Sequence, residues 1–139
     1  LHHTSGFSYY SDTNPNAKQG WIATNPKGGE EITFQIDLPR DTCYVVYLAV
    51  LRSYKGMGQF IVTTKDEITG KKTVKEADGL WEAHISVWSD IQLTGEDDAT
   101  ACTGLCKVTV KTKPKVKGRK KNKVKIYTLS VRKCEKEIF

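Results

Sequence analysis

A short run with an arginine, a tyrosine and a lysine is one segment of this sequence that could hold a ligand. Residues 52–58 read Arg-Ser-Tyr-Lys-Gly-Met-Gly and follow an apolar stretch, and the two glycines permit an irregular turn. Arg52 and Lys55 could donate hydrogen bonds from fixed positions, and Tyr54 could offer a flat ring. A structural interpretation has equal weight: Arg52 pairs with an acid, Tyr54 covers the core and the glycines form a bend.

The tryptophans are the second candidates for binding. Trp88 lies in an alternating stretch, 83–93, on the side opposite the apolar residues, so we expect its ring to be exposed. An exposed ring can stack on a sugar or an apolar ligand while its polar edge stays in water. Trp21 and Trp81 could instead seal the ends of the fold. The predicted ligand-binding residues are Arg52, Tyr54, Lys55, Trp81 and Trp88.

Positive charge is concentrated in residues 111–125, which hold nine basic residues and no acid. The whole chain carries +6, so the rest of it carries −3. A solvated loop is the commoner meaning of such a run, but it could also bind a sulfated or carboxylated polysaccharide in a salt-dependent way. The loop has no aromatic residue for stacking on bases, so nucleic acid is not an expected partner. The candidate polyanion-binding residues are Lys117, Arg119, Lys120 and Lys121.

Motifs of common enzymes are absent from the sequence: there is no G-x-S-x-G, no H-E-x-x-H and no glycine-rich nucleotide loop. Glu82 and His84, two apart on an expected strand, could form an acid–base pair, although a surface pair is favoured. Residues 96–98 are Glu-Asp-Asp and could offer oxygens to Ca²⁺, but consecutive acids cannot all face one ion. We therefore predict no enzyme activity, no metal site and no cofactor.

The four cysteines favour two disulfides. None of them forms a C-x-x-C pair, and no histidine stands at a spacing that would complete a zinc site. Cys102 and Cys106 could close a local loop, which leaves Cys43 and Cys134 to join an early strand to the last one. Buried free thiols in a reducing compartment remain the alternative.

Period-2 alternation predicts the elements that position these groups. The length of 139 residues suits one domain over 1–139, with residues 43–51 as a strand covered on both faces. The fold class predicted is all-β, a two-sheet antiparallel β-sandwich, jelly-roll-like, with eight or nine strands. A basic hairpin loop of about 112–123 should join the last two. No apolar run approaches the roughly 20 residues of a membrane span, so no membrane insertion is expected. The expected strands are 7–10, 21–24, 32–38, 43–51, 59–64, 72–75, 83–93, 106–111 and 124–131.

Several short motifs carry a family resemblance: Gln19-Gly-Trp-Ile-Ala23, Leu51-Arg-Ser-Tyr-Lys-Gly-Met-Gly58, Asp78-Gly-Leu-Trp81, and Lys123-Val-Lys-Ile before a closing Leu-Ser-Val. With these the chain resembles poorly characterised β-sandwich accessory domains attached to SGNH-hydrolase-like or glycan-related proteins of plants and algae. The resemblance implies a non-catalytic accessory role in the secretory pathway and no particular ligand. Members of that family carry further cysteines where this chain has Thr63-Thr-Lys, so their disulfide pattern is not carried over.

Three functional hypotheses follow. The first is a carbohydrate-binding or glycan-associated accessory domain of a larger secretory-pathway protein, as the resemblance implies. The start at Leu1, without a Met or a signal region, favours a piece of a longer protein. The second is a protein-interaction or structural module, in which the tryptophans are buried. The third is polyanion binding through the basic loop. The expected partner is thus a glycan or polysaccharide that could be anionic, with a protein partner as the alternative.

Overall fold

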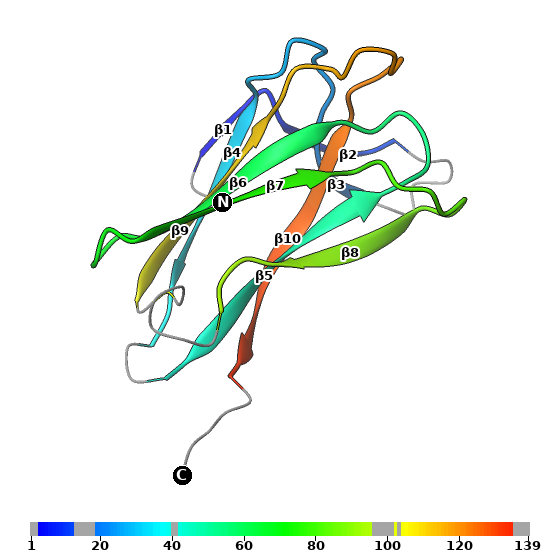
Figure 1. The fold of residues 1–139 in the computed structure, drawn as a ribbon. Helices are drawn as coiled ribbons and strands as arrows, with labels where there is room; N and C mark the ends of the chain where they lie inside the picture. Colours follow the sequence, from blue (N-terminus) through cyan, green and yellow to red (C-terminus); the bar gives the residue numbers. More distant parts are fainter. Residues whose placement is uncertain (1–2, 13–18, 40–41, 96–101, 103, 135–139) are drawn as a thin grey trace.

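The computed structural model describes residues 3–12, 19–39, 42–95, 102 and 104–134. Over these residues the chain forms ten strands and no helix. The strands make two five-stranded antiparallel sheets that face each other (Figure 1). The predicted β-sandwich is confirmed, with one strand more than expected. No described helix is long and apolar enough to cross a membrane.

Each sheet draws its strands from distant parts of the sequence. The first sheet has the order β1 (His3–Ser5), β4 (Glu31–Asp37), β9 (Leu105–Thr112), β6 (Gln59–Asp66) and β7 (Lys72–Asp78). The second has the order β2 (Ser8–Ser11), β3 (Gln19–Ala23), β10 (Val124–Lys133), β5 (Tyr44–Arg52) and β8 (Val87–Gln92). From β3 to β6 the chain changes sheet at every connection, as in a jelly roll.

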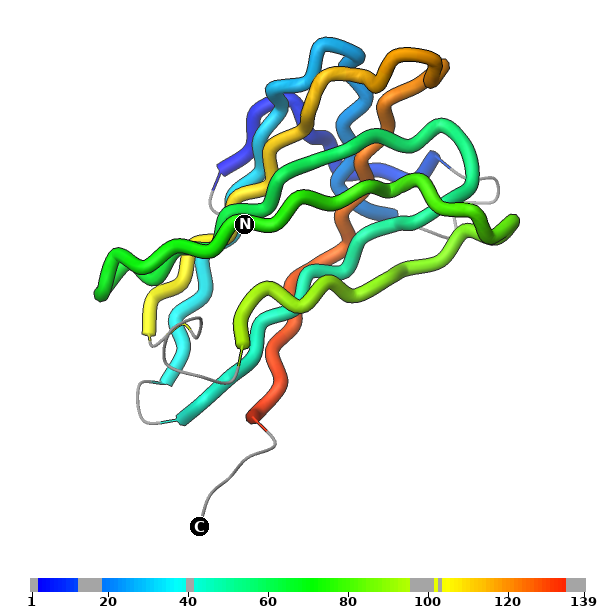
Figure 2. Tube along the Cα trace, in the orientation of Figure 1, coloured from blue at the N-terminus to red at the C-terminus, as the bar shows by residue number. Residues whose placement is uncertain are grey.

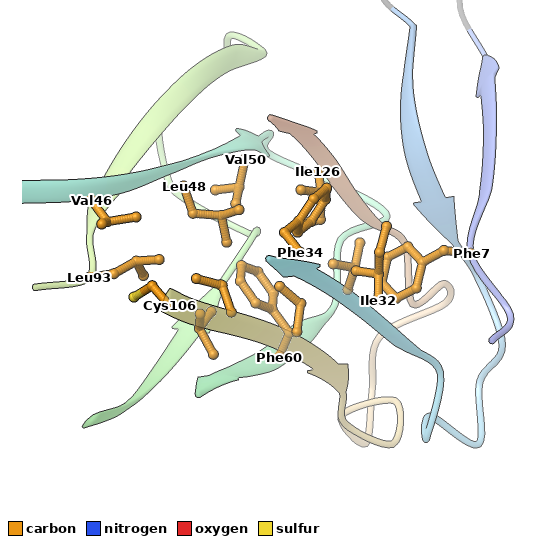
Figure 3. Packing of buried hydrophobic residues seen from close by; sticks show 14 of the residues in the cluster. Phe7, Ile32, Phe34, Val46, Leu48, Val50, Phe60, Leu93, Cys106 and Ile126 are labelled. Atoms are coloured by element: carbon orange, nitrogen blue, oxygen red, sulfur yellow. The ribbon is translucent and has the colours of Figure 1, made fainter. Parts of the chain in front are cut away.

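The core lies between the two sheets. Ile32 and Phe34 of β4 point inward as the alternation of 32–38 predicts, and both are buried. They meet Phe60 from the same sheet and side chains such as Ile126 from the opposite one (Figure 3). Burial of these side chains removes apolar area from water and provides the main stabilisation of the sandwich.

The register of the second sheet shows which residues point away from this core. Directly paired residues share a face, and Val50 pairs with Ile126 on the core side. Neighbouring residues alternate in direction, so the pair of Leu51 with Trp88 lies on the outer face. The pair of Ile22 with Lys125 lies there too. Leu51 and Ile22 are buried yet stand outside the core cluster, so this outer face covers apolar groups of its own.

Three details differ from the predicted strands. The stretch 83–93 becomes a strand only from Val87, so Glu82 and His84 lie in an irregular turn and not two apart on a strand. The basic segment is not a hairpin loop, because β9 and β10 belong to different sheets and the segment crosses between them (Figure 2). A bulge between Ile126 and Thr128 also breaks the clean alternation predicted for 124–131.

Both disulfides proposed from the cysteine spacing are present. Cys43 and Cys134, 91 residues apart, flank the neighbouring strands β5 and β10 with their Cα atoms 5.5 Å apart. Cys102 and Cys106 close a short loop at the start of β9. Two disulfides indicate folding in an oxidising compartment.

Candidate functional site

Residues 113–123, the basic connection, join β9 to β10. A pocket of about 880 Å³ opens between the segment 53–56 and the end of this connection. The groups on its wall come from five separate parts of the chain, so it exists only in the folded protein. Its lining residues are Asp12, Thr24, Pro26, Ser53, Tyr54, Lys55, Gly56, Leu80, Ser86, Arg119, Lys120, Lys121, Asn122 and Lys123.

Backbone hydrogen bonds hold the 53–58 segment on both sides. The N–H of Gly58 donates to the carbonyl of Lys123 over 2.8 Å, and the N–H of Lys123 donates to the carbonyl of Gly56 over 3.0 Å. On the other side the N–H of Ser53 donates to Gly79. Gly56 has a φ of +74°, which favours glycine, whereas a Cβ on Gly58 would clash with Asn122. Gly56 is thus required for the backbone conformation of this turn, and Gly58 for its close approach to Asn122.

Buried Asn122 fixes the end of the basic connection. Its Nδ2 donates to the carbonyl of Asn25 over 3.0 Å and to that of Lys113 over 2.9 Å. These bonds bring the turn after β3 beside the basic connection, and the two lie side by side at one end of the sandwich (Figure 2). Asn122 therefore joins the turn after β3 to both ends of the basic connection.

Arg119 is the second residue that holds the basic connection in place, through hydrogen bonds to Asp78. Its guanidinium donates to both carboxylate oxygens of Asp78 over 2.9 and 2.7 Å, and to the carbonyl of Met57 over 3.3 Å. Partial burial acts to raise the pKa of Asp78, but the bonds from Arg119 and its other donors hold that pKa below its usual range. A bidentate pair of this kind fixes geometry as well as charge.

The open part of the pocket combines an aromatic ring with unpaired cations. Tyr54 is 40% exposed, and its ring stacks on His84 with centroids 5.2 Å apart and planes 10° apart. The ammonium of Lys55 lies 5.7 Å from the centre of the Tyr54 ring. Within the described part of the chain, Lys55, Lys120 and Lys121 form no ion pair. These three ammonium groups are therefore available to an anion.

Asp12 places one carboxylate on the pocket wall. Lys123 donates to its Oδ2 over 2.7 Å, and Lys125 donates to its Oδ1 over 2.9 Å. Partial burial alone would raise the pKa of Asp12, but the two lysines together lower it to about 2. The side chain of Lys125 is 0% exposed, so Asp12 neutralises a cation that has lost its water.

A stacked ring pair continues from this cluster onto the outer face of the second sheet. The ammonium of Lys125 lies 5.6 Å from the centre of the Trp88 ring. Trp88 stacks in turn on Tyr127, with centroids 5.0 Å apart. Trp88 is half-buried, whereas Tyr127 is 48% exposed. Tyr127 is therefore the more exposed ring of the pair.

The structure brings part of each predicted residue set into one pocket. Five of the nine predicted site residues line it: Tyr54, Lys55, Arg119, Lys120 and Lys121. Two regions that look independent in the sequence thus line a single pocket. Arg119 already pairs with Asp78. The residues of the basic connection that could bind an anion in the pocket are therefore Lys120 and Lys121.

The other predicted residues lie around the pocket. Arg52, at the end of β5, is partly buried and its Nε has no hydrogen-bond partner among the described residues. Trp81 donates from Nε1 to the carbonyl of Ile85 over 2.9 Å and so closes the 81–85 turn. Lys117 is exposed and does not line the pocket. All three tryptophans are partly buried, and Trp21 packs against the core.

Three contributors were missed in the sequence: Asp12, His84 as a stacking partner, and Tyr127. Asp12 follows two tyrosines without any motif, and only the fold brings it to Lys125. Tyr127 carries a usable signal, since it is two residues from Lys125 on a strand and so shares its face. Residues 96–98, considered for Ca²⁺, lie outside the described residues. Within the described ranges no group of three or more His, Cys, Asp or Glu could hold a metal ion.

No protein-family model matches the chain, and no curated protein matches it by sequence. Solved structures do resemble it. A two-domain esterase active on acetylated mannans superposes with a TM-score of 0.64 at 14% identity over 96% of this chain. The chain spans only 33% of that esterase. The same esterase co-crystallised with mannopentaose gives a TM-score of 0.65 at 13% identity, over 99% of this chain and 34% of that one.

A stand-alone domain matches nearly end to end. The carbohydrate-binding module TmCBM61, in complex with β-1,4-galactotriose, has a TM-score of 0.63 at 15% identity, covering 95% of this chain and 88% of that one. At such identities the likeness concerns the fold. This chain therefore has the β-sandwich architecture that is found in a carbohydrate-binding module and in one part of an esterase.

Proposed function

We propose that this protein is a non-catalytic carbohydrate-binding domain, and that its pocket receives an acidic unit of a glycan. The observation that carries the proposal is the meeting of the stacked Tyr54 ring with three lysines, Lys55, Lys120 and Lys121, that form no ion pair with any described residue, in one open pocket. The domain would be an accessory part of a larger secreted protein, in keeping with its two disulfides and its resemblance to glycan-related accessory domains.

The ring favours a sugar over a purely charged ligand. A half-exposed aromatic face can stack on the apolar C–H face of a pyranose, while nearby donors and acceptors bind its hydroxyl groups. His84 supports Tyr54 from behind, which limits the rotamer entropy lost when a ligand binds. Asp12 supplies a fixed acceptor elsewhere in the lining of the pocket. The binding of galactotriose by TmCBM61 gives the proposal a precedent on the same fold.

The lysines favour an acidic sugar over a neutral one. Other cations of the basic connection are engaged, since Lys113 pairs with Glu76 and Arg119 with Asp78. Lys120 and Lys121 have no such partner in the described residues and face the same cavity as Lys55. A carboxylate or sulfate in the pocket would gain charge-assisted hydrogen bonds from them. Protein or phosphate-rich ligands are the alternatives that the test must separate.

Calorimetry with defined oligosaccharides tests the proposal. The panel contains oligogalacturonides, heparin-derived oligosaccharides, a neutral galacto-oligosaccharide and inorganic polyphosphate. We expect an acidic series to bind, the neutral one to bind more weakly, and Lys120→Gln with Lys121→Gln to weaken acidic binding about tenfold at low salt. Tyr54→Ala should weaken binding to the sugars but leave any polyphosphate binding unchanged.

Lys65→Gln with Lys107→Gln is the matched control. It removes the same charge from the outer face of the first sheet, where both lysines contact Glu67 and neither lines the pocket. This variant should bind like the wild type. An equal loss in both double variants would mean that only net charge matters, and no binding to any glycan would contradict the proposed function.

A further inference from the structure

The pocket has a physical continuation on the outer face of the second sheet. Asp12 lies on the pocket wall and bonds Lys125, whose ammonium lies over Trp88, which stacks on Tyr127. The backbone follows the same route, because Ser86 lines the pocket and Trp88 is two residues further, about 7 Å along the chain. The ring pair is therefore linked to the pocket lining both by these contacts and along the chain.

We propose that the ligand is a chain of sugar units which leaves the pocket along this route, and that a further unit stacks on the open face of Tyr127. The inference rests on the proposed function, and it adds a second subsite and a dependence on ligand length. Trp88 is a positioning residue in this arrangement, because Tyr127 and the Lys125 ammonium lie against its ring.

A purely structural role for the two rings explains part of the arrangement. Leu51, opposite Trp88 in the ladder, and Ala49, opposite Thr128, are buried on this outer face and need cover. That role does not require the outer ring to remain 48% exposed. Nor does it require a desolvated lysine, because an apolar residue at position 125 would cover the sheet without the cost of burying a charge. A polar, ring-bearing surface next to a pocket is what a sugar chain would use.

The molecule contains a matched ring pair away from this route. Tyr9 is 50% exposed, lies on a strand of the same sheet and packs against Trp21 at 5.2 Å. It pairs in register with Trp21, which packs against the core, so it does not lie on the outer face with Tyr127. Tyr9→Ala thus removes a similar ring with similar exposure from another surface, and controls for a general loss of stability.

The test is calorimetry of wild type, Tyr127→Ala, Tyr127→Phe and Tyr9→Ala with oligogalacturonides and heparin-derived oligosaccharides of increasing length, from the monosaccharide upward. We expect wild-type affinity to rise with length. Tyr127→Ala should lose about three- to tenfold in affinity for the longer oligosaccharides and nothing for the monosaccharide. Tyr127→Phe keeps the ring and should retain most of the gain, and Tyr9→Ala should match the wild type.

Two results would overturn the inference while the proposed function stands. One is wild-type affinity that does not change with oligosaccharide length. The other is a Tyr127→Ala variant that keeps the full gain with length, or loses it no more than Tyr9→Ala does. If the wild type binds none of these oligosaccharides but remains folded, both the inference and the proposed function are wrong.

Discussion

The outer faces of the two sheets are built in contrasting ways. On the first sheet, Lys65 and Lys107 face each other across the ladder, and the Glu67 carboxylate lies 3.7 and 3.2 Å from their ammonium groups. Lys111 and Glu31 form a further ion pair, 3.8 Å apart. These are partly exposed pairs in water, and pairs of this kind contribute little to stability.

The second sheet has a buried cation and stacked rings on its outer face instead. Lys125 is fully covered and its partner Asp12 is only 23% exposed, so their interaction is weakly screened by solvent. The first face is organised for solubility, whereas the second keeps costly polar groups in fixed positions beside a pocket. The second face is the one that our proposal assigns to the ligand, and the contrast between the two faces can be tested by stability measurements.

The largest expected effect concerns the disulfides. They serve the comparison because each is attached to one sheet. Cys43→Ala with Cys134→Ala should lower the free energy of unfolding by about 4 to 5 kcal/mol, because the lost cross-link closes a loop of 91 residues in the unfolded chain. The Cys102–Cys106 disulfide closes a loop of only 4 residues, so Cys102→Ala with Cys106→Ala should cost about 2 kcal/mol. Urea unfolding without reductant measures both. Equal losses of unfolding free energy in the two double variants would show that the second sheet does not depend specially on the Cys43–Cys134 disulfide.

The next effect is the loss of one partner from each ion-paired cluster. Asp12→Ala removes the carboxylate that contacts the buried Lys125 ammonium and should cost about 3 kcal/mol of unfolding free energy. Glu67→Ala, on the first sheet, leaves two lysines that remain exposed to water, and its cost should be much smaller. The same urea experiment compares them. A similar loss in both variants would remove the contrast between the faces.

The smallest effect is a pH dependence. The pKa of Asp12 is about 2 in the folded protein and near 3.8 when unfolded, so its ion pairs stabilise the fold fully above pH 4. That contribution, about 2 kcal/mol, is lost as the pH falls from 4 towards 2. The difference in unfolding free energy between wild type and Asp12→Asn should therefore shrink over this range. A difference that stays constant with pH would show that Asp12 acts without its charge.

Particular residues show how far the sequence reaches. The alternation of β4 and the apolar run of β5 predict the core correctly, because burial of a sheet face requires every second residue to be apolar. In β10 the same reasoning puts Leu129 beside Lys125 on the outer face. The bulge after Ile126 instead turns Leu129 towards the core, where it pairs with Leu48. One inserted residue is enough to reverse a strand's faces, and alternation cannot reveal it.

The candidate site divides in the same way. From residue types alone come the sandwich, the disulfide pairs and the two candidate binding segments, since strand periodicity and side-chain chemistry are local properties. Only the tertiary structure decides that β9 and β10 lie in different sheets, which turns a supposed hairpin into a crossing that brings Lys120 and Lys121 to Tyr54. It also decides which charges are engaged, because Asp78 and Asp12 lie 41 and 113 residues from the cations that they neutralise. Pairings over such separations depend on packing, and no local pattern encodes them.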